Sequence, residues 1–201
     1  MKGAKAFTVF LLLLAVFFPG LPAQTSLEQM RATIAASRPF KMDFTQQVFV
    51  DGEMTVEESG IIVFADRTLV KWQYLRPDEK TFILENGSYQ FYDRENNQLL
   101  KGKIDPSHEQ AIWDLLCSPH PGQASRWEER TRTIRLSVDA GADRQELKIK
   151  IGPDFLPERV EQSGANEVTT VYTFRNYRTR VTLAAGEFSL PLPGDVEIIE
   201  D

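Results

Sequence analysis

Side chains that could carry out catalysis are few in this sequence, and Cys117 with His120 form the best placed pair. A nucleophilic cysteine needs a nearby base, and the stretch Cys-Ser-Pro-His places an imidazole three residues after the thiol. The pair lies where a helix is expected to end, whereas helix N-termini are the ends that stabilise a thiolate. A packed thiol beside a loop histidine is the simpler interpretation, and an enzyme using this pair remains an alternative.

Other catalytic and metal-binding patterns are missing from the sequence. His108 and His120 are the two histidines, and no HxxxH, HxxE or CxxC spacing occurs. There is no GxSxG, no P-loop and no glycine-rich dinucleotide turn. Carboxylate pairs such as Glu57-Glu58 are typical of solvated strands. We therefore expect a protein that is not an enzyme, with no catalytic residue, no metal and no cofactor.

The segment 60–93 contains aromatic residues instead, spread over several short expected strands. Trp72, Tyr74, Phe82, Phe91 and Tyr92 all lie within it. Val70, Trp72 and Tyr74 share parity, so they face the same side of one strand. A sheet face this rich in aromatics must be covered by something apolar. The cover is either the protein's own dry core or a ligand in a cavity, and composition alone favours neither.

The first 23 residues have the layout of a secretory signal peptide. Lys2 and Lys5 precede an apolar run from Ala6 to Phe18, which a proline, a glycine and a second proline break before Ala23. The run is too short and too promptly broken for a spanning helix. We expect export, with cleavage near Ala23, and one domain over residues 24–201.

Charge and cysteine content exclude some classes of partner. Without residues 1–23, the chain has 21 basic and 29 acidic residues, a net charge of −8. This balance argues against nucleic acid and against electrostatic docking on anionic lipid. Cys117 is the single cysteine, so no intramolecular disulfide can form. The fold must therefore be held by packing, and the protein is expected to be a monomer.

The remaining pattern predicts many strands and two helices. One helix is expected from Leu27 to about Ser37, with Leu27, Met30 and Ile34 on one face, and another at about 106–117. From Phe40 onward the apolar period changes to two. Strands are expected near 40–50, 54–64, 68–75, 80–85, 88–93, 97–104, 125–130, 132–139, 144–151, 157–163, 167–178, 180–183 and 187–190. Asp51-Gly52 and Asn86-Gly87 are hairpin signals, so neighbouring strands should be antiparallel.

Several motifs follow one another along the chain, beginning with Phe44-Thr45-Gln46 and the block from Gly60 to Tyr74. These two resemble the FTQ-type motif and the G-x-hydrophobic and RW-x-Y block of the outer-membrane lipoprotein carrier (LolA) family of periplasmic chaperones. The resemblance covers about residues 25–200. It continues through Pro77, Asn86-Gly87, Phe91-Tyr92-Asp93, Leu156-Pro157, Tyr172, Phe174, Asn176, Phe188, Pro191, Pro193-Gly194 and Val196.

The resemblance implies a mainly β fold, an unclosed antiparallel barrel or strongly curved sheet of about 11 strands with a helical lid. It implies a periplasmic carrier that takes acyl chains of lipoproteins from an inner-membrane ABC transporter to an outer-membrane acceptor. A periplasmic lipid- or lipoprotein-binding sensor of the same fold is the alternative. We expect the cavity to be lined by Phe44, Val70, Trp72, Tyr74, Phe82, Leu84 and Phe91, with Ile112 and Leu115 from the lid.

The family's lid is held closed by an arginine in the turn before the tryptophan strand. Here that turn reads Ala65-Asp66-Arg67-Thr68, with the arginine displaced by one position and the family's proline lost. Arg67 is the expected latch, defined here as the residue that bonds to the lid helix. The alternative is an exposed turn arginine, which would contribute little.

Overall fold

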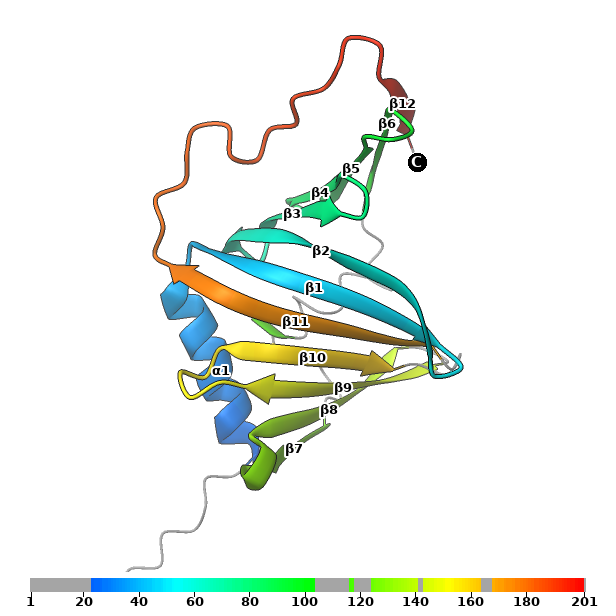
Figure 1. Cartoon of the computed structure of the whole chain (residues 1–201). Helices are drawn as coiled ribbons and strands as arrows, with labels where there is room; N and C mark the ends of the chain where they lie inside the picture. The colour runs from blue at the N-terminus through cyan, green and yellow to red at the C-terminus, as the bar shows by residue number, and fades with distance from the viewer. Residues whose placement is uncertain (1–22, 104–115, 118–123, 141–142, 164–167, 201) are drawn as a thin grey trace, which may run out of the picture.

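A single, mainly antiparallel sheet dominates the computed structural model of this protein (Figure 1). The structure describes residues 23–103, 116–117, 124–140, 143–163 and 168–200. The elements are α1 (Ala23–Ser37), β1 (Phe40–Val50), β2 (Glu53–Asp66), β3 (Leu69–Arg76), β4 (Lys80–Glu85), β5 (Ser88–Asp93), β6 (Gln98–Lys103), β7 (Ala124–Glu128), a 3-10 turn (Glu129–Thr131), β8 (Thr133–Ala140), β9 (Asp143–Ile151), β10 (Pro157–Ser163), β11 (Val168–Thr179) and β12 (Glu197–Glu200).

The 12 strands form one sheet in the order β12-β6-β5-β4-β3-β2-β1-β11-β10-β9-β8-β7. The sheet curves strongly. Since β1 and β2 lie between β11 and β3, a flat sheet would hold those two strands about 14 Å apart. The rings of Trp72 on β3 and Tyr172 on β11 nevertheless stack with centroids 5.7 Å apart. The expected unclosed, curved sheet is confirmed.

Two-residue turns at the predicted positions set the register of the hairpins. Asp51 and Gly52 have φ values of 52° and 81°, and Asn86 and Gly87 have values of 50° and 80°. Consecutive left-handed residues make the type I′ turn, whose twist matches that of paired strands. Both turns join neighbours, β1 with β2 and β4 with β5.

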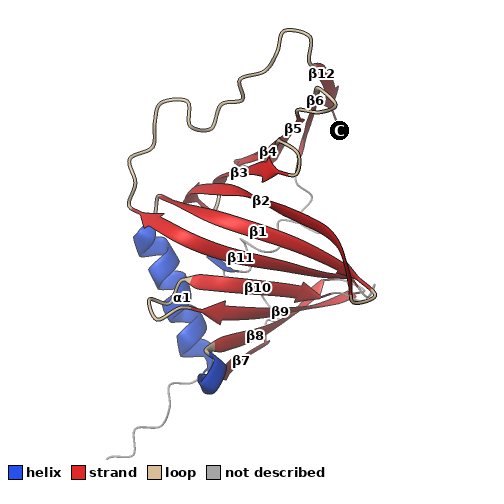
Figure 2. Cartoon of the chain, viewed as in Figure 1, coloured by secondary structure: helices blue, strands red, loops and turns tan. Residues whose placement is uncertain are grey.

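Helix α1 packs on one face of the sheet, mainly against β7 and β8, and we call this the inner face (Figure 2). Its predicted stripe of Leu27, Met30 and Ile34 is buried in the main core. The helix begins at Ala23, four residues before the predicted start. The predicted helix at 106–117 lies outside the described residues except for Leu116 and Cys117, which are helical. Leu116 is fully buried in the same core.

The prediction of strands at 180–183 and 187–190 is wrong, because residues 180–196 form an extended loop. This loop is here called the C-terminal strap. The strap runs from the end of β11 to β12 (Figure 1, orange to red). Its start is tied to the end of α1 by a hydrogen bond from Arg180 N to Ser37 O of 3.0 Å. β12 then pairs with β6, the one parallel pairing of the described sheet, and the sequence pattern had not indicated it.

The strap crosses the outer face of the sheet, opposite α1. Val63 on β2 is paired in register with Lys41 on β1 and with Lys71 on β3. Lys41 Nζ lies 2.8 Å from Glu187 Oε1, and Lys71 Nζ donates to Glu187 O at 3.0 Å. The strap therefore passes over Val63, which is buried outside the main core.

Candidate functional site

A row of apolar side chains crosses seven neighbouring strands on the inner face. Residues directly opposite each other in antiparallel strands point to the same face, so the register identifies the row. Its members are Met42, Ile62, Trp72, Phe82, Phe91, Leu100 and Ile199. Three of these, Trp72, Phe82 and Phe91, were predicted cavity residues. The row makes one continuous apolar strip from β1 to the edge strand β12.

Burial decreases along this strip toward the edge of the sheet. Met42 and Ile62 are fully buried, while Trp72, Phe82, Phe91 and Leu100 are partly buried. The last member, Ile199, is 40% exposed. Partly exposed aromatic rings in a continuous row leave apolar area that a ligand could bury.

Trp72 lies at the centre of an aromatic network on this face. Its ring centroid is 5.7 Å from Phe44 and 5.7 Å from Tyr172, and Tyr172 stacks in turn on Phe174 at 6.3 Å. Contacts of this geometry stabilise the rings beyond their buried area. Strands β3, β1 and β11 thus supply one aromatic surface.

Gly60 allows two of these rings to meet. It is the register partner of both Phe44 on β1 and Tyr74 on β3, and the two rings contact edge to face at 5.1 Å. A Cβ added at Gly60 would lie 1.9 Å from Gln73 O. Glycine is therefore required here for close approach of the β3 backbone.

Polar contacts border the aromatic surface on the side of the β1–β2 hairpin tip. Tyr74 OH donates to Gln46 Oε1 at 3.1 Å, and Lys80 Nζ lies 3.1 Å from Glu58 Oε1. The hydrogen bond to Glu58 raises the pKa of the Lys80 ammonium above its usual value. The apolar surface thus ends at a polar border, which would suit a ligand with an apolar and a polar end.

The predicted cavity residues of the described strands gather on this one face. Phe44, Val70 and Leu84 are buried in its core, and Trp72, Tyr74 and Phe82 pack against them. Ile112 and Leu115 lie outside the described residues. Reasoning from the sequence missed Tyr172 and Leu100 as members of the surface. The alternation of Tyr172 with Phe174 was a signal for the former, but its partner Trp72 is 100 residues away.

Arg67 lies in the exposed turn between β2 and β3. Asp66 fixes this turn, because its Oδ1 accepts from Thr68 N at 2.7 Å and from Thr68 Oγ1 at 2.6 Å. These bonds lower the pKa of the Asp66 carboxyl below its usual value. The turn is therefore well defined without the family's proline.

The described residues offer few side chains for a function other than binding. Cys117 is partly buried and packs against the core, and His120 lies outside the part described. Within the described ranges, no three His, Cys, Asp or Glu side chains gather as a metal site. No helix among these residues is both long and apolar enough to cross a bilayer.

Two hollows formed by described residues lie elsewhere, on the outer face. The larger, of about 410 Å³, lies over β11, β1, β2 and β3, and the smaller, of about 220 Å³, over β7, β8 and β9. Neither is lined by the half-buried rings of Trp72, Phe82 or Phe91. Of the aromatic residues of the inner face, Phe44 alone is among those that line a hollow, the larger one.

The sequence is similar to known carrier proteins over most of its length. Residues 35–191 match the family model described as outer membrane lipoprotein carrier protein LolA. An outer-membrane lipoprotein carrier protein of Vibrio parahaemolyticus is 26% identical over 63% of this chain, a match that spans only 59% of that relative. The carrier of Pseudoalteromonas translucida is 20% identical, over 85% of each chain.

Solved structures share the fold at low identity. An uncharacterised conserved protein from Thermus thermophilus has a TM-score of 0.58 at 15% identity, covering 89% of this chain and 99% of its own. A LolA superfamily protein from Nitrosomonas europaea has a TM-score of 0.50 at 10% identity, covering 85% and 99%. With a family model matched from residue 35 to residue 191, this chain belongs to the outer membrane lipoprotein carrier protein (LolA) family.

Proposed function

We propose that this protein carries lipoproteins across the periplasm by covering their acyl chains with the inner face of its sheet. The observation that carries the proposal is the apolar strip whose side chains remain partly exposed from Trp72 to Leu100. Family membership supports it, because the named relatives are lipoprotein carriers. The protein acts by binding and release, without catalysis.

An acyl chain would lie along the strip, against Trp72, Phe82 and Phe91. Each methylene removed from water contributes about 0.8 kcal/mol, so a lipoprotein with several chains needs such a cover to leave a membrane. The polar border at Gln46 and Lys80 would face the polar part of the cargo. Partial exposure of the rings suits a carrier, because a site must also release what it binds.

The proposed pathway has three kinds of partner. Acylated lipoproteins are the cargo, an inner-membrane lipoprotein-releasing ABC transporter loads the carrier, and an outer-membrane acceptor unloads it. The carrier itself is a monomer of residues 24–201, exported with residues 1–23 as its signal peptide. Nucleic acid is not a partner, which agrees with the acidic balance of the chain.

Acyl binding can be tested with a matched pair of variants on β5. Phe91 and Tyr92 are consecutive, so they face opposite sides of the sheet. With a fluorescent fatty acid as probe, Phe91→Ser should weaken binding roughly tenfold, since about 1.4 kcal/mol of apolar contact is lost. Tyr92→Ser, on the outer face, should bind as the wild type does. Equal binding by all three proteins would contradict the proposal.

Transport can be tested on protein purified from the periplasm. Mass spectrometry should find bound lipoproteins, and the loaded protein should transfer them to outer-membrane vesicles. Bound lipid that is never transferred would favour the sensor alternative. Recovery of no acylated ligand, together with no binding of the fatty acid probe, would overturn both.

We also propose Arg67 as the latch of the lid. Its place in the well-defined turn after β2 is the support for this role. Arg67→Leu should change the rate of cargo release while leaving the free energy of unfolding within about 0.5 kcal/mol of wild type. Arg130→Leu, in the exposed turn after β7, is the matched control. Wild-type release by Arg67→Leu would overturn the latch.

A further inference from the structure

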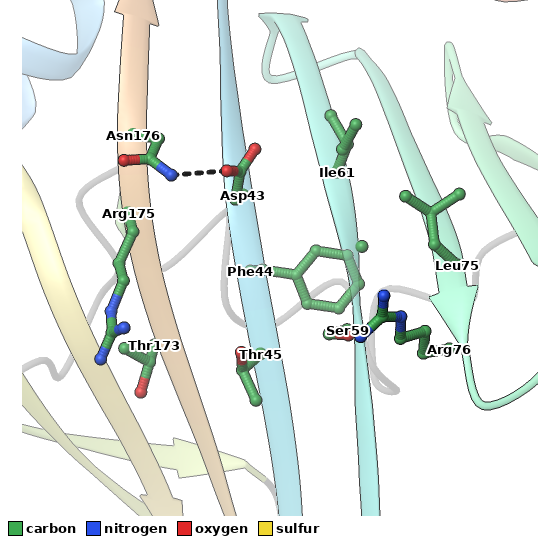
Figure 3. A pocket seen from close by; sticks show the side chains of 11 residues that line it. Asp43, Phe44, Thr45, Ser59, Ile61, Leu75, Arg76, Thr173, Arg175 and Asn176 are labelled. Carbon is green, nitrogen blue, oxygen red and sulfur yellow. Dashed lines mark hydrogen bonds between the residues drawn. The ribbon is translucent and has the colours of Figure 1, made fainter.

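The larger hollow of the outer face, of about 410 Å³, has a floor of hydroxyl groups (Figure 3). Thr173 on β11, Thr45 on β1 and Ser59 on β2 are consecutive register partners, so their side chains form a row across three strands. Their hydroxyls make no hydrogen bond to other described residues. We call this hollow, over β11, β1, β2 and β3, the outer groove.

Bulges in the two flanking strands shape the walls of the outer groove. On β3, Ser59 is paired with Arg76 and Gly60 with Tyr74, which leaves Leu75 as an extra residue. A bulge turns neighbouring side chains to the same side, so Leu75 and Arg76 both line the groove. Leu75 is 43% exposed there.

On β11 the register also shifts, at Asn176. Asp43 is paired with Arg175 and Lys41 with Arg178. The two residues of β11 between these arginines therefore lie opposite a single residue of β1, Met42. Asn176 adopts a left-handed φ of 54°. Such conformations persist where the surrounding structure requires them, and they are frequent at binding sites. The bulge brings Arg175 and Asn176 to the same wall of the groove.

The outer groove has more positively charged side chains than carboxylates to pair with them. Its one carboxylate, Asp43, accepts from Asn176 Nδ2 at 2.7 Å and lies 3.3 Å from Arg178 Nη2. Arg76 and Arg175 have no ion pair with any residue in the described ranges. Figure 3 shows them on opposite sides of the groove. Two guanidinium groups and a row of hydroxyl donors therefore face solvent in a protein of net charge −6.

We propose that the outer groove binds an extended acidic segment of a partner protein. Strands β11 and β3, which carry Arg175 and Arg76, are three strand spacings apart, about 14 Å measured along the curved sheet. An extended peptide spans that distance in about four residues, so two carboxylates at positions i and i+4 would reach both arginines. The exposed Leu75 would contact an apolar side chain between them. The site is independent of acyl binding, because it lies on the opposite face of the sheet.

The test is binding of a labelled heptapeptide to the mature protein, measured by fluorescence anisotropy at low salt. The peptide has two aspartates four positions apart with a valine between them. Arg76→Ser and Arg175→Ser should each weaken binding roughly three- to tenfold, since each removes a charged hydrogen-bond donor. Arg130→Ser, with the same change of net charge, should leave binding unchanged. Binding should also fall as salt is raised.

Three results would overturn the proposal. Equal binding of the same peptide with asparagines would exclude recognition of carboxylates. Equal losses in Arg76→Ser and Arg130→Ser would show that only net charge matters. Displacement of the peptide by inorganic phosphate at equal concentration would identify a site for small oxyanions instead. Fatty acid binding by the Arg76→Ser protein, measured in parallel, shows that the variant is folded.

Discussion

The two halves of the inner face are built from the same alternating strands but differ in what covers them. On β8, β9 and β10 the inward side chains Ile134, Ile149 and Val160 are fully buried. The inward side chains of Trp72 on β3, Phe82 on β4 and Phe91 on β5 remain partly exposed. The first set is here called the covered half and the second the open half.

Helix α1 accounts for this difference. It packs mainly against β7 and β8, where Met30 and Ile34 complete a dry core. A sheet of 12 strands is wider than one helix of 15 residues can cover. The inward side chains of the covered half are therefore buried in a dry core, and the open half has apolar area left for a ligand.

Substitution in the covered half should have the largest effect on stability. Ile149→Ala removes a fully buried side chain and should lower the free energy of unfolding by about 3 kcal/mol. Phe91→Ala in the open half should lower it by only about 1 kcal/mol, because its ring is partly exposed. Urea denaturation of both variants measures the difference. Equal losses would remove the distinction between the halves.

Gly60 lies on β2, at the boundary of the two halves. Gly60→Val should destabilise the protein by about 2 kcal/mol, because the new side chain would overlap Gln73 O and separate β2 from β3. Gly194→Val is the control, since nothing lies within 4 Å of its Cβ position. Thermal denaturation compares the two, and similar melting temperatures would show that β3 can move away from β2 at little cost.

The outer face behind the open half depends on Glu187 of the C-terminal strap. The hydrogen bond from Lys41 lowers the pKa of the Glu187 carboxyl below its ordinary 4.5. A lowered folded-state pKa means that the carboxylate stabilises the fold above pH 4.5, and that this contribution is lost as pH falls through the folded value. Glu187→Gln should therefore cost about 0.5–1 kcal/mol at neutral pH.

The pH dependence of that variant separates a charge effect from a packing effect. Urea denaturation of wild type and Glu187→Gln should give stabilities that converge as the pH falls through the lowered pKa of Glu187, because the carboxylate of the wild type is then protonated. If the difference in the free energy of unfolding stayed constant from neutral to acidic pH, the effect of Glu187 would come from packing and not from its charge.

The smallest effect is expected for an ion pair at the far end of the open half. Arg94 and Glu79 form this pair with side chains that are 66% and 56% exposed. Arg94→Ala should change the free energy of unfolding by less than about 0.5 kcal/mol, because solvent screens the pair. A loss as large as that of Phe91→Ala would show that the loops of the open half contribute more than its rings.

Local sequence signals were sufficient for most of the strands. The pairs Asp51-Gly52 and Asn86-Gly87 predicted hairpin turns, and both adopt the left-handed conformations that such turns require. The shared parity of Val70, Trp72 and Tyr74 also corresponds to one face of β3. These features depend on residues that are close in the chain, so period and turn chemistry identify them.

Long-range features could not be predicted in this way. β12 exists because Glu197–Glu200 pairs with β6, about 100 residues earlier, and its side chains are all exposed. The strap between β11 and β12 was mistaken for strands because its apolar residues alternate as those of a strand do. The contact of Trp72 with Tyr172 likewise depends on the curvature of the whole sheet.

The sequence by itself determined the class of fold, the family and the shared side of Val70, Trp72 and Tyr74 on one strand, because periodicity and motif order are local properties. The tertiary structure decided which half of the inner face α1 covers, which rings meet across the curve and where two bulges form the outer groove. These outcomes follow from register and curvature, which are set by contacts between residues far apart in the chain.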